Sequence, residues 1–494
     1  MIEKEIKTQK FIVKYFTEIM IKGDRAKKQM LNQLLMNLHK LSKDISNDIV
    51  LKKFFDKIEL VTPLEFSSVL KEKLLQTPGI DQVLEAIQIN DMDSLDKIKV
   101  EVNKYMSNEI VDKTFVIRAK RVGTQDFKSM DIEQTVGGYM LAHNKTKGVD
   151  LRNAEVTIKL ELEHTKLNII TQRYSGLGGF PLGSQGEILS LMSGGFDSTV
   201  ASYLSIKRGL KTHFIFFNLG GIAHEIGVKQ VSWYLWNKFA STHRVSFITI
   251  PFEDVVGQIF KDISPSYMGV MLKRLMIIAA QKVAKNMKID ALITGESVAQ
   301  VSSQTLRNLS LIDSVSDILI LRPLAMMSKP DIIDIATKIG TKKFAEAMPE
   351  YCGVISQNPV TAGSYDRVEK EAKNFDYTIL EEAIKNAKIK NIDEVLDDVC
   401  EVGTLEVVNS VGENEIVVDI RQSNDILKAS CEVLKIPFYD LKKEFKKLDS
   451  SKTYLLYCDK GVLSQLHGQY LKDEGKYTNI KVFRGTVHNF VSIR

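Results

Sequence analysis

Short apolar runs alternate with stretches of helical periodicity through the middle of the chain. The pattern predicts strands at 188–192, 213–217, 245–250 and 290–294, and helices at 197–208, 225–239 and 271–286. Near-continuous apolar strands separated by helices are typical of a parallel sheet that is covered on both faces. We therefore predict an α/β region built on a doubly wound sheet.

The first third of the chain mixes strands and helices in a different order. An apolar, strand-like run at 11–16 precedes a basic helical pattern at 22–43, and a second module starts near residue 60. That module is predicted to hold helices at 63–75 and 94–106 and strands at 114–119 and 155–160. Both modules are expected to be small α+β units. The glycine-rich stretch 174–183 is expected to be a linker or an ordered crossing loop.

The last quarter of the chain is expected to form a further compact α/β unit. Charged helical sequence from 366 to about 401 is interpreted as a connector, and apolar runs at 415–420 and 453–457 predict strands. A chain of 494 residues is too long for one hydrophobic core, so we expect three or four domains.

Composition is that of an ordinary globular protein. Hydrophobic residues make up 44% and charged residues 26% of the chain, and no apolar stretch is long enough to span a bilayer. The first residues lack the pattern of a signal peptide, so we expect a cytoplasmic protein without a membrane partner. The net charge of +5 is compatible with a nucleic-acid partner if the basic surface is local.

The cysteines are dispersed along the chain, at Cys352, Cys400, Cys431 and Cys458. None belongs to a CxxC pair, which argues against a zinc or iron–sulfur site, and we expect no metal-ligating cluster of side chains. Cys400 and Cys431 are interpreted as small buried hydrophobic residues.

The segment Ser193-Gly194-Gly195-Phe196-Asp197-Ser198 joins an expected strand to an expected helix. Its glycines let the backbone turn tightly and approach an anion. The helix that follows directs N–H groups and its positive dipole end at the same point. Because a Gly-Lys-Ser/Thr sequence is missing, the loop differs from the P-loop. We predict that it binds the pyrophosphate part of a nucleotide.

Other polar residues are expected near this loop because they end neighbouring strands, where open α/β sheets bind ligands. Residues 294–297 (Thr-Gly-Glu-Ser) end one strand and are followed by Gln300 and Gln304, and Asn-Leu-Gly-Gly at 218–221 ends another. Lys273 and Lys329 are candidate phosphate-binding cations, although a single lysine is more often a solvated surface charge.

A second strand-to-helix loop carries a cysteine. Cys458 opens the run Cys-Asp-Lys-Gly-Val-Leu-Ser, and Asp-Ile-Arg at 419–421 ends the preceding strand. The N–H groups of such a loop and the following helix dipole favour a thiolate. A nucleotide loop and a nucleophilic sulfur in one chain indicate ATP-dependent sulfur transfer. Cys352 stands in a loop bounded by Pro349 and Gly353, and its local sequence assigns it no role.

These motifs resemble known families. The run at 193–198 matches the loop of the PP-loop ATP pyrophosphatases, and the Cys458 loop with 419–421 resembles the rhodanese domain over about 407–494. Together with 217–221, 223–227, 301–306 and 349–356, their order resembles the tRNA 4-thiouridine synthetases (tRNA uridine 4-sulfurtransferases) in the longer form with a rhodanese tail.

The resemblance implies a multidomain α/β protein. The implied domains are a ferredoxin-like α+β domain at 1–60, an RNA-binding THUMP domain at 61–172, a doubly wound PP-loop ATP pyrophosphatase domain at 173–370, a helical linker at 371–405 and a rhodanese-like α/β domain at 406–494.

The resemblance also assigns roles to residues. The implied catalytic residues are Asp197, Lys329, Cys352 and Cys458, with a persulfide on Cys458 that is resolved as a Cys352–Cys458 disulfide. ATP, with Mg²⁺, is implied to contact Leu191, Met192, Ser193, Gly194, Gly195, Ser198, Phe216, Phe217, Lys273, Gly295 and Gln304. Phosphates of tRNA are implied to contact Arg118, Lys120 and Arg121.

The implied reaction adenylates O4 of a uridine, at position 8 of tRNA in the family, and replaces the AMP with sulfur. The implied partners are tRNA, a cysteine desulfurase as sulfur donor, and a thiazole sulfur-carrier protein, because the family's rhodanese domain also supplies sulfur for thiamine. The oligomeric state, a homodimer included, is left open, and so is the choice between persulfide attack and a released hydrosulfide.

Two other classes of protein stay open. One is a different PP-loop enzyme, amidotransferase-like or 2-thiolating, which a CxxC cluster or a glutaminase domain would favour; the sequence shows neither. The other is a sulfur carrier whose nucleotide loop is a relic. The intact Gly194, Gly195, Asp197 and Ser198 argue against the second class.

Overall fold

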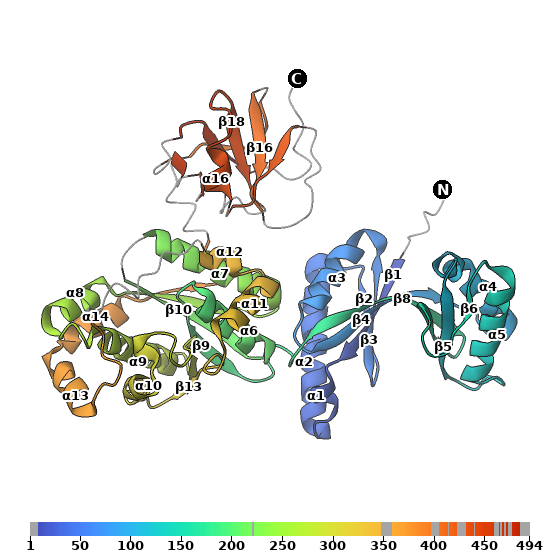
Figure 1. Cartoon of the computed structure of the whole chain (residues 1–494), viewed down its shortest axis with the longest axis horizontal. Coiled ribbons are helices and arrows are strands. Elements are labelled where there is room, and N and C mark those ends of the chain that lie inside the picture. The colour runs from blue at the N-terminus through green and yellow to red at the C-terminus, as the bar shows by residue number, and fades with distance from the viewer. Residues whose placement is uncertain are drawn as a thin grey trace. The chain divides into compact units, whose positions relative to one another are not determined.

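The computed structural model describes residues 8–219, 222–346, 358–396, 405–412, 414–421, 431–438, 440–458, 464, 467–468, 471–472 and 477–484. The chain divides into two compact units (Figure 1). Unit 1 comprises 1–186, 206–210 and 238–242, and unit 2 comprises 187–205, 211–237 and 243–494. No helix in the described ranges is long and apolar enough to cross a membrane.

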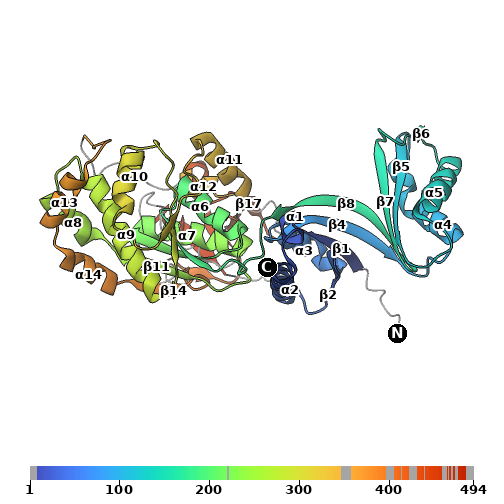
Figure 2. The same cartoon turned by 90° about the horizontal axis from the view of Figure 1, so that it is seen from below.

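One eight-stranded sheet runs through unit 1, in the strand order β2-β3-β1-β4-β8-β7-β5-β6. Its strands are β1 Thr8–Tyr15, β2 Val50–Lys53, β3 Lys57–Pro63, β4 Ile80–Ile89, β5 Thr114–Val122, β6 Gly148–Val149, β7 Val156–Glu163 and β8 Lys166–Gly178. The long strands β4 and β8 pair antiparallel and join the two halves of the sheet, as Figure 2 shows. The two modules expected from the sequence therefore share one sheet, and the stretch expected at 174–183 to be a linker or crossing loop begins as the end of β8.

Helices enclose two separate cores on this sheet. They are α1 Thr17–Met20, α2 Asp24–Ile45, α3 Ser67–Leu75, α4 Leu95–Met106 and α5 Ser129–His143, with the 3₁₀ helices η1 Leu64–Phe66 and η2 Ser107–Ile110. Leu34 and Leu38 of α2 lie in one core with Phe11 of β1. Val136 of α5 lies in the other core with Phe115 of β5. The basic helix predicted at 22–43 is confirmed as α2, whose apolar stripe is buried.

The short segments 206–210 and 238–242 complete unit 1. The backbone N–H of Phe180 donates to the carbonyl of Lys207 at 3.0 Å, and the ammonium of Lys40 donates to the carbonyl of Thr242 at 2.8 Å. Gly179 has φ +74°, and a Cβ on it would lie 1.9 Å from the carbonyl oxygen of Lys207. Only glycine allows this approach, so the contact depends on the glycine-rich stretch.

A six-stranded sheet in the order β13-β12-β9-β10-β11-β14 forms the first part of unit 2. Its strands are β9 Glu187–Leu191, β10 Lys211–Asn218, β11 Ser246–Pro251, β12 Ala291–Ile293, β13 Leu319–Leu321 and β14 Lys388–Asn391. All neighbours are parallel except β14, which runs antiparallel to β11. From β9 the chain adds strands first on one side and then on the other. Ligands bind at such a switch point, here the carboxyl ends of β9 and β12.

Ten helices of the described ranges belong to this α/β region. They are α6 Phe196–Lys207, α7 Ile222–Phe239, α8 Glu253–Asp262, α9 Met268–Asn286, the 3₁₀ helix η3 Ser302–Gln304, α10 Leu306–Asp313, α11 Lys329–Ile339, α12 Lys342–Glu346, α13 Tyr365–Asn374 and α14 Tyr377–Lys385. Met271 and Leu275 of α9 are fully buried in the core against Ile248 of β11. The parallel, doubly wound arrangement predicted from the alternation of strands and helices is therefore present in this region.

The expectation of a helical linker at 371–405 requires correction in its described part. Leu380 of α14 is fully buried in the core of the six-stranded sheet, together with Phe375. β14 is a strand, because Lys388 pairs with Thr249 of β11 and extends the sheet. Lysines are common on exposed edge strands, but they interrupt the apolar pattern by which a strand is predicted from sequence. The segment is thus largely part of the α/β domain rather than a spacer.

The described C-terminal residues form a third sheet, with the parallel order β15-β19-β18-β16-β17. Its elements are β15 Val407–Val408, β16 Glu415–Asp419, β17 Val433–Lys435, α16 Leu441–Phe445, β18 Thr453–Tyr457 and β19 Ile480–Phe483. Val417, Leu455 and Phe483 are fully buried in its core. The strands predicted at 415–420 and 453–457 are confirmed as β16 and β18.

Candidate active site

The loop between β9 and α6 is closed by its own serines. Gly194 has φ +83°, a conformation that favours glycine. The hydroxyl of Ser198 accepts a hydrogen bond from the backbone N–H of Ser193 at 3.2 Å. His224 Nε2 donates to the carbonyl of Ser193 at 2.9 Å. Burial lowers the pKa of His224, so the ring is neutral and holds the loop through this N–H.

Two side chains from distant parts of the chain converge on Asp197, in the first turn of α6. Lys329 Nζ, at the start of α11, lies 2.8 Å from Asp197 Oδ1 and 2.9 Å from Oδ2. Gln300 Nε2 donates to Asp197 Oδ2 at 2.9 Å. The structure therefore brings the predicted residues Asp197 and Lys329 together and adds Gln300 to them.

Gly295, which follows β12, lies against the start of α6. A Cβ on Gly295 would stand 2.5 Å from the carbonyl carbon of Asp197 and 2.6 Å from the nitrogen of Ser198. These distances are too short for any side chain, so the position requires glycine. The predicted residues of β12 and of the nucleotide loop are in direct contact at the switch point of the sheet.

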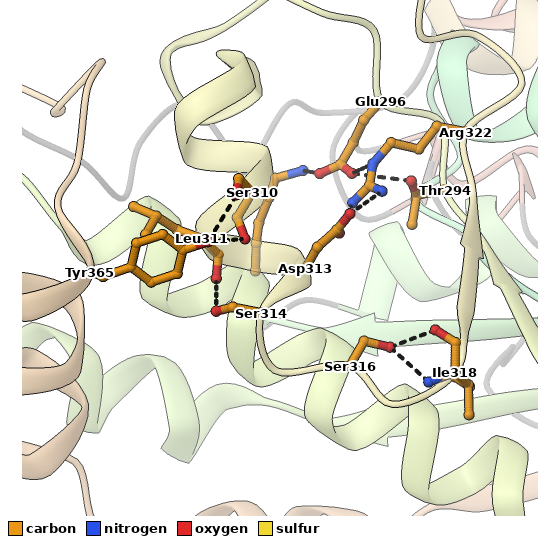
Figure 3. A network of polar contacts seen from close by, with 11 residues as sticks. Thr294, Glu296, Ser310, Leu311, Asp313, Ser314, Ser316, Ile318, Arg322 and Tyr365 are labelled. Atoms are coloured by element: carbon orange, nitrogen blue, oxygen red, sulfur yellow. Dashed lines mark hydrogen bonds and ion pairs between the residues drawn. The ribbon is translucent and has the colours of Figure 1, made fainter.

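Glu296, the next residue, is buried between two cations (Figure 3). Lys273 Nζ of α9 lies 2.9 Å from Oε1, Arg322 Nε lies 2.8 Å from Oε2, and the Thr294 hydroxyl donates to Oε2 at 3.1 Å. Burial alone would raise the pKa of Glu296, but the charges of Lys273 and Arg322 outweigh it and lower the pKa to about 2. Arg322 also binds both carboxylate oxygens of Asp313.

The ion pair with Glu296 orients the side chain of Lys273, which the sequence suggested as a phosphate ligand. Lys273 and Arg322 come from α9 and from the end of β13, and one carboxylate of Glu296 holds them both. A lysine whose ammonium is already oriented loses less side-chain entropy when it binds an anion. The ion pair therefore keeps the ammonium of Lys273 oriented at Glu296, the residue after Gly295.

The remaining residues expected to contact ATP are of two kinds. Gln304 is buried, and its Oε1 has no hydrogen-bond partner among the described residues. Met192, Phe216 and Phe217 are buried, and the backbone N–H of Met192 donates to the carbonyl of Ile215 at 2.8 Å. Leu191, at the end of β9, is half-buried. A buried amide oxygen without a hydrogen-bond donor is the kind of group that a polar ligand satisfies.

These features fit a nucleoside triphosphate. The helix N-terminus, Lys329 and Lys273 supply positive charge, and Gln304 supplies an unsatisfied amide. The described residues contain no group of three or more His, Cys, Asp or Glu side chains that could hold a metal ion. Mg²⁺ commonly uses one or two carboxylates together with substrate phosphates, and Asp197 is the carboxylate available for that purpose.

Of the Cys458 loop (residues 458–464), the structure describes Cys458 and Ser464. Cys458 follows β18 and is buried. In the register of β16 and β18, Asp419 stands beside Tyr457. Asp419 is fully buried and binds Arg421, with Nε at 2.9 Å, and Lys435, with Nζ at 2.9 Å. Burial would raise the pKa of Asp419, but the hydrogen bonds from Arg421 and Lys435 lower it.

Of the other cysteines, the structure describes only Cys431. Cys352, Cys400 and residues 459–463 lie outside the described residues, so the pairing of Cys352 with Cys458 stays a prediction. Cys431 is half-buried and packs against the core of the third sheet, and burial raises the pKa of its thiol.

The three basic residues expected to contact RNA lie on β5 but do not form one patch. Arg118 and Lys120 are exposed on the same side of the strand, whereas Arg121 lies on the side of the buried Ile117. Arg121 Nη1 donates to the carbonyl of Gly123 at 2.8 Å. Arg121 therefore stabilises the turn after β5.

Sequence reasoning missed three residues of the site. Gln300 was noted only as a neighbour of the strand end, and His224 only as part of a motif; Arg322 was not noted at all. Arg322 could have been found as a cation directly after the apolar run 319–321, which ends a strand next to β12. The contacts of Gln300 and His224 depend on tertiary structure and leave no local pattern.

Comparison with known sequences gives two family matches and many full-length relatives. Residues 183–377 match the family described as thiamine biosynthesis protein (ThiI), and 93–172 match the THUMP domain. A tRNA sulfurtransferase of Saccharophagus degradans is 45% identical over 483 residues, which cover 96% of this chain and 100% of the relative. A tRNA sulfurtransferase of Escherichia coli O1:K1 is 44% identical over 482 residues, with coverage of 96% and 100%.

Two solved structures resemble the chain over most of its length. A 4-thiouridine synthetase in complex with RNA and bound ATP is 25% identical, with a TM-score of 0.69 over 78% of this chain and 100% of that chain. PH1313 from Pyrococcus horikoshii is 18% identical, with a TM-score of 0.52 over 67% of this chain and 99% of that chain. The second likeness concerns the fold alone.

Proposed function

Because the chain belongs to the tRNA sulfurtransferase family, we propose that it converts a uridine of tRNA, at position 8, into 4-thiouridine in an ATP-dependent reaction. One observation carries the proposal: Lys329 and Gly295 both contact Asp197, next to the loop at the switch point of the sheet. The relatives' name and the solved 4-thiouridine synthetase with RNA and ATP support the choice of substrates.

The first step is proposed to be adenylation. O4 of the uridine attacks the α-phosphorus of ATP, an O4–P bond forms, and the bond to the leaving pyrophosphate breaks. The N–H groups at the start of α6 and the ammonium of Lys329 stabilise the charge that develops on the pyrophosphate. Lys273, held by Glu296, adds a second cation. Bound Mg²⁺ would supply further charge stabilisation, with Asp197 as the residue that holds it.

The second step is proposed to transfer sulfur from Cys458. A cysteine desulfurase loads Cys458 as a persulfide, whose terminal sulfur attacks C4 of the uridine and displaces AMP. Cys352 then attacks the Cys458 sulfur, which breaks the sulfur–sulfur bond, releases 4-thiouridine and leaves a Cys352–Cys458 disulfide. A thiol reductant restores both cysteines. In the alternative, the Cys352 thiolate attacks the Cys458 sulfur first, so that a Cys352–Cys458 disulfide forms and hydrosulfide is released; the hydrosulfide then attacks C4 and displaces AMP.

The domain limits and further partners are part of the proposal. Residues 1–60 are assigned as a ferredoxin-like domain, 61–172 as the RNA-binding THUMP region, 173–370 as the PP-loop domain and 406–494 as a rhodanese-like domain. The parallel five-stranded sheet with Cys458 at the end of a strand supports the last assignment. Supply of sulfur to a thiazole carrier protein, and a cytoplasmic location, are proposed from the family alone.

The proposal is tested with unmodified tRNA, Mg-ATP, cysteine and a cysteine desulfurase, with 4-thiouridine measured by its near-ultraviolet absorbance. We expect product from the wild-type protein and none from Asp197→Ala or Cys458→Ser. Cys431→Ser is the matched control, because Cys431 packs against the core of the same five-stranded sheet and its substitution is expected to leave product formation unchanged. Persulfide on Cys458 without any thiolated tRNA would reject the RNA substrate and leave a sulfur carrier.

A further inference from the structure

Asp197 is held by two donors of different charge. Lys329 contacts both carboxylate oxygens, at 2.8 and 2.9 Å, whereas Gln300 contacts only Oδ2, at 2.9 Å. Lys329 carries a full charge, and Gln300 is a neutral amide. In the reaction proposed above, Lys329 has to turn from Asp197 toward the pyrophosphate. The amide of Gln300 would then remain as a hydrogen-bond donor to Asp197.

Gln300 is presented by a turn in an uncommon conformation. Ala299 has φ +65°, in the left-handed region that residues other than glycine rarely adopt. Its backbone N–H donates to the carbonyl of Gln304 at 2.9 Å, and the N–H of Gln300 donates to the carbonyl of Ser297 at 3.4 Å. Strained residues persist where surrounding contacts fix them, and they cluster at functional sites.

The turn is also bonded to the loop that leads to Lys329. The backbone N–H of Val298 donates to the carbonyl of Ala325 at 3.0 Å, and the hydroxyl of Ser297 donates to the carbonyl of Met327 at 2.9 Å. Lys329 begins α11 two residues after Met327. The amide and the ammonium that bind Asp197 therefore come from two loops that support each other.

We propose that Gln300 is a positioning residue that keeps the Asp197 carboxylate oriented while Lys329 leaves it for the pyrophosphate. The inference rests on the proposed adenylation and deepens it. A neutral donor suits this role, because it holds one oxygen without competing with the phosphates for Lys329 and without adding charge to the site. Its loss lets the carboxylate rotate, and misplacement by about 1 Å can lower a rate about 100-fold.

The test compares Gln300→Leu, which keeps the size of the side chain and removes its donor, with the wild type. Affinity for ATP is measured by fluorescence of a labelled analogue, and adenylation by single-turnover release of pyrophosphate with tRNA. We expect the dissociation constant of ATP to change less than about threefold, and the rate constant to fall about 10- to 100-fold. Gln258→Leu is the matched control, because Gln258 donates to the carboxylate of Asp262 on α8 in the same domain.

A double variant with Lys329 distinguishes a positioning role of Gln300 from a general effect of the substitution on folding. If both residues act through Asp197, Lys329→Met combined with Gln300→Leu loses less activity than the product of the two single losses. Equal losses of ATP affinity and rate, a rate within threefold of wild type, or a double variant that loses the full product of the two single losses would each overturn the inference. Pyrophosphate release that is absent in the wild type would instead reject the proposed function.

Discussion

Glu296 keeps its negative charge in the protein interior because two cations compensate for the lost hydration. The carboxylate is 5% exposed and binds Lys273 and Arg322, and Arg322 in turn binds Asp313. Two positive and two negative charges thus balance within one cluster. Removing one member leaves a buried charge without compensation, which is costlier than never having buried the group.

We expect Glu296→Gln to lower stability by about 3 kcal/mol or more at pH 7. The pKa of Glu296 is about 2 in the folded protein against an ordinary 4.5. Its stabilising contribution is therefore complete above about pH 4.5 and is lost as the pH falls toward 2. The difference in melting temperature between wild type and variant, measured by calorimetry, should shrink between pH 5 and 3.

Glu346→Gln is the control for this prediction. Glu346 pairs with Lys342 and Lys343 at the surface of α12, and its side chain is 44% exposed. Exposed pairs contribute about 0–1 kcal/mol, so the variant should melt within a degree or two of wild type. A difference for Glu296→Gln that stays constant with pH would show that its carboxylate is not the titrating group.

The helices, strands and loops differ in how well they could be predicted from the sequence. The nucleotide loop was predicted because its tight turn, its glycines and the following helix are local properties. β14 was not predicted, because its lysines alternate with a single exposed isoleucine, Ile389, at the edge of the sheet. Gln300 and Arg322 escaped prediction for a related reason: each acts on a residue far away in the sequence, Asp197 and Glu296 respectively.

The helix α14 supplies a prediction at this scale. If residues 377–385 belong to the core, Leu380→Ala should destabilise the protein by about 2–5 kcal/mol, because Leu380 is fully buried and its truncation leaves a cavity. Ile389→Ala on β14 is the control, since Ile389 is 60% exposed and should cost little. Denaturant unfolding followed by tryptophan fluorescence measures both. If both variants lowered the free energy of unfolding by the same small amount, residues 377–385 would again be interpreted as a linker.

In the molecule as a whole, the basic side chains proposed to contact tRNA lie in unit 1, on β5. Arg118 and Lys120 are exposed side by side on β5, whereas Arg121 is tied to the turn that follows. The net charge of +5 is too small to attract RNA everywhere, so local groups have to supply the contacts.

Lys120→Ala should therefore weaken tRNA binding and reduce the slope of log affinity against log salt concentration by about 0.7–0.9, because one phosphate contact is lost. Arg121→Ala should leave the slope unchanged, since Nη1 of its guanidinium donates to Gly123 and Gln125 within the protein. Filter binding between about 50 and 200 mM salt tests both. Identical slopes for wild type and Lys120→Ala would show that Lys120 does not contact an RNA phosphate.

Unit 1 is assembled from three separate stretches of chain, and this restricts how the protein can evolve. A recombination event with one junction after residue 186 would exchange the N-terminal part of unit 1 but leave 206–210 and 238–242 behind. The hybrid would have to recreate the contacts of Lys207 and Thr242 with a foreign Phe180 or Lys40 equivalent. The N-terminal region and the α/β region are therefore expected to be inherited together, as a matched pair.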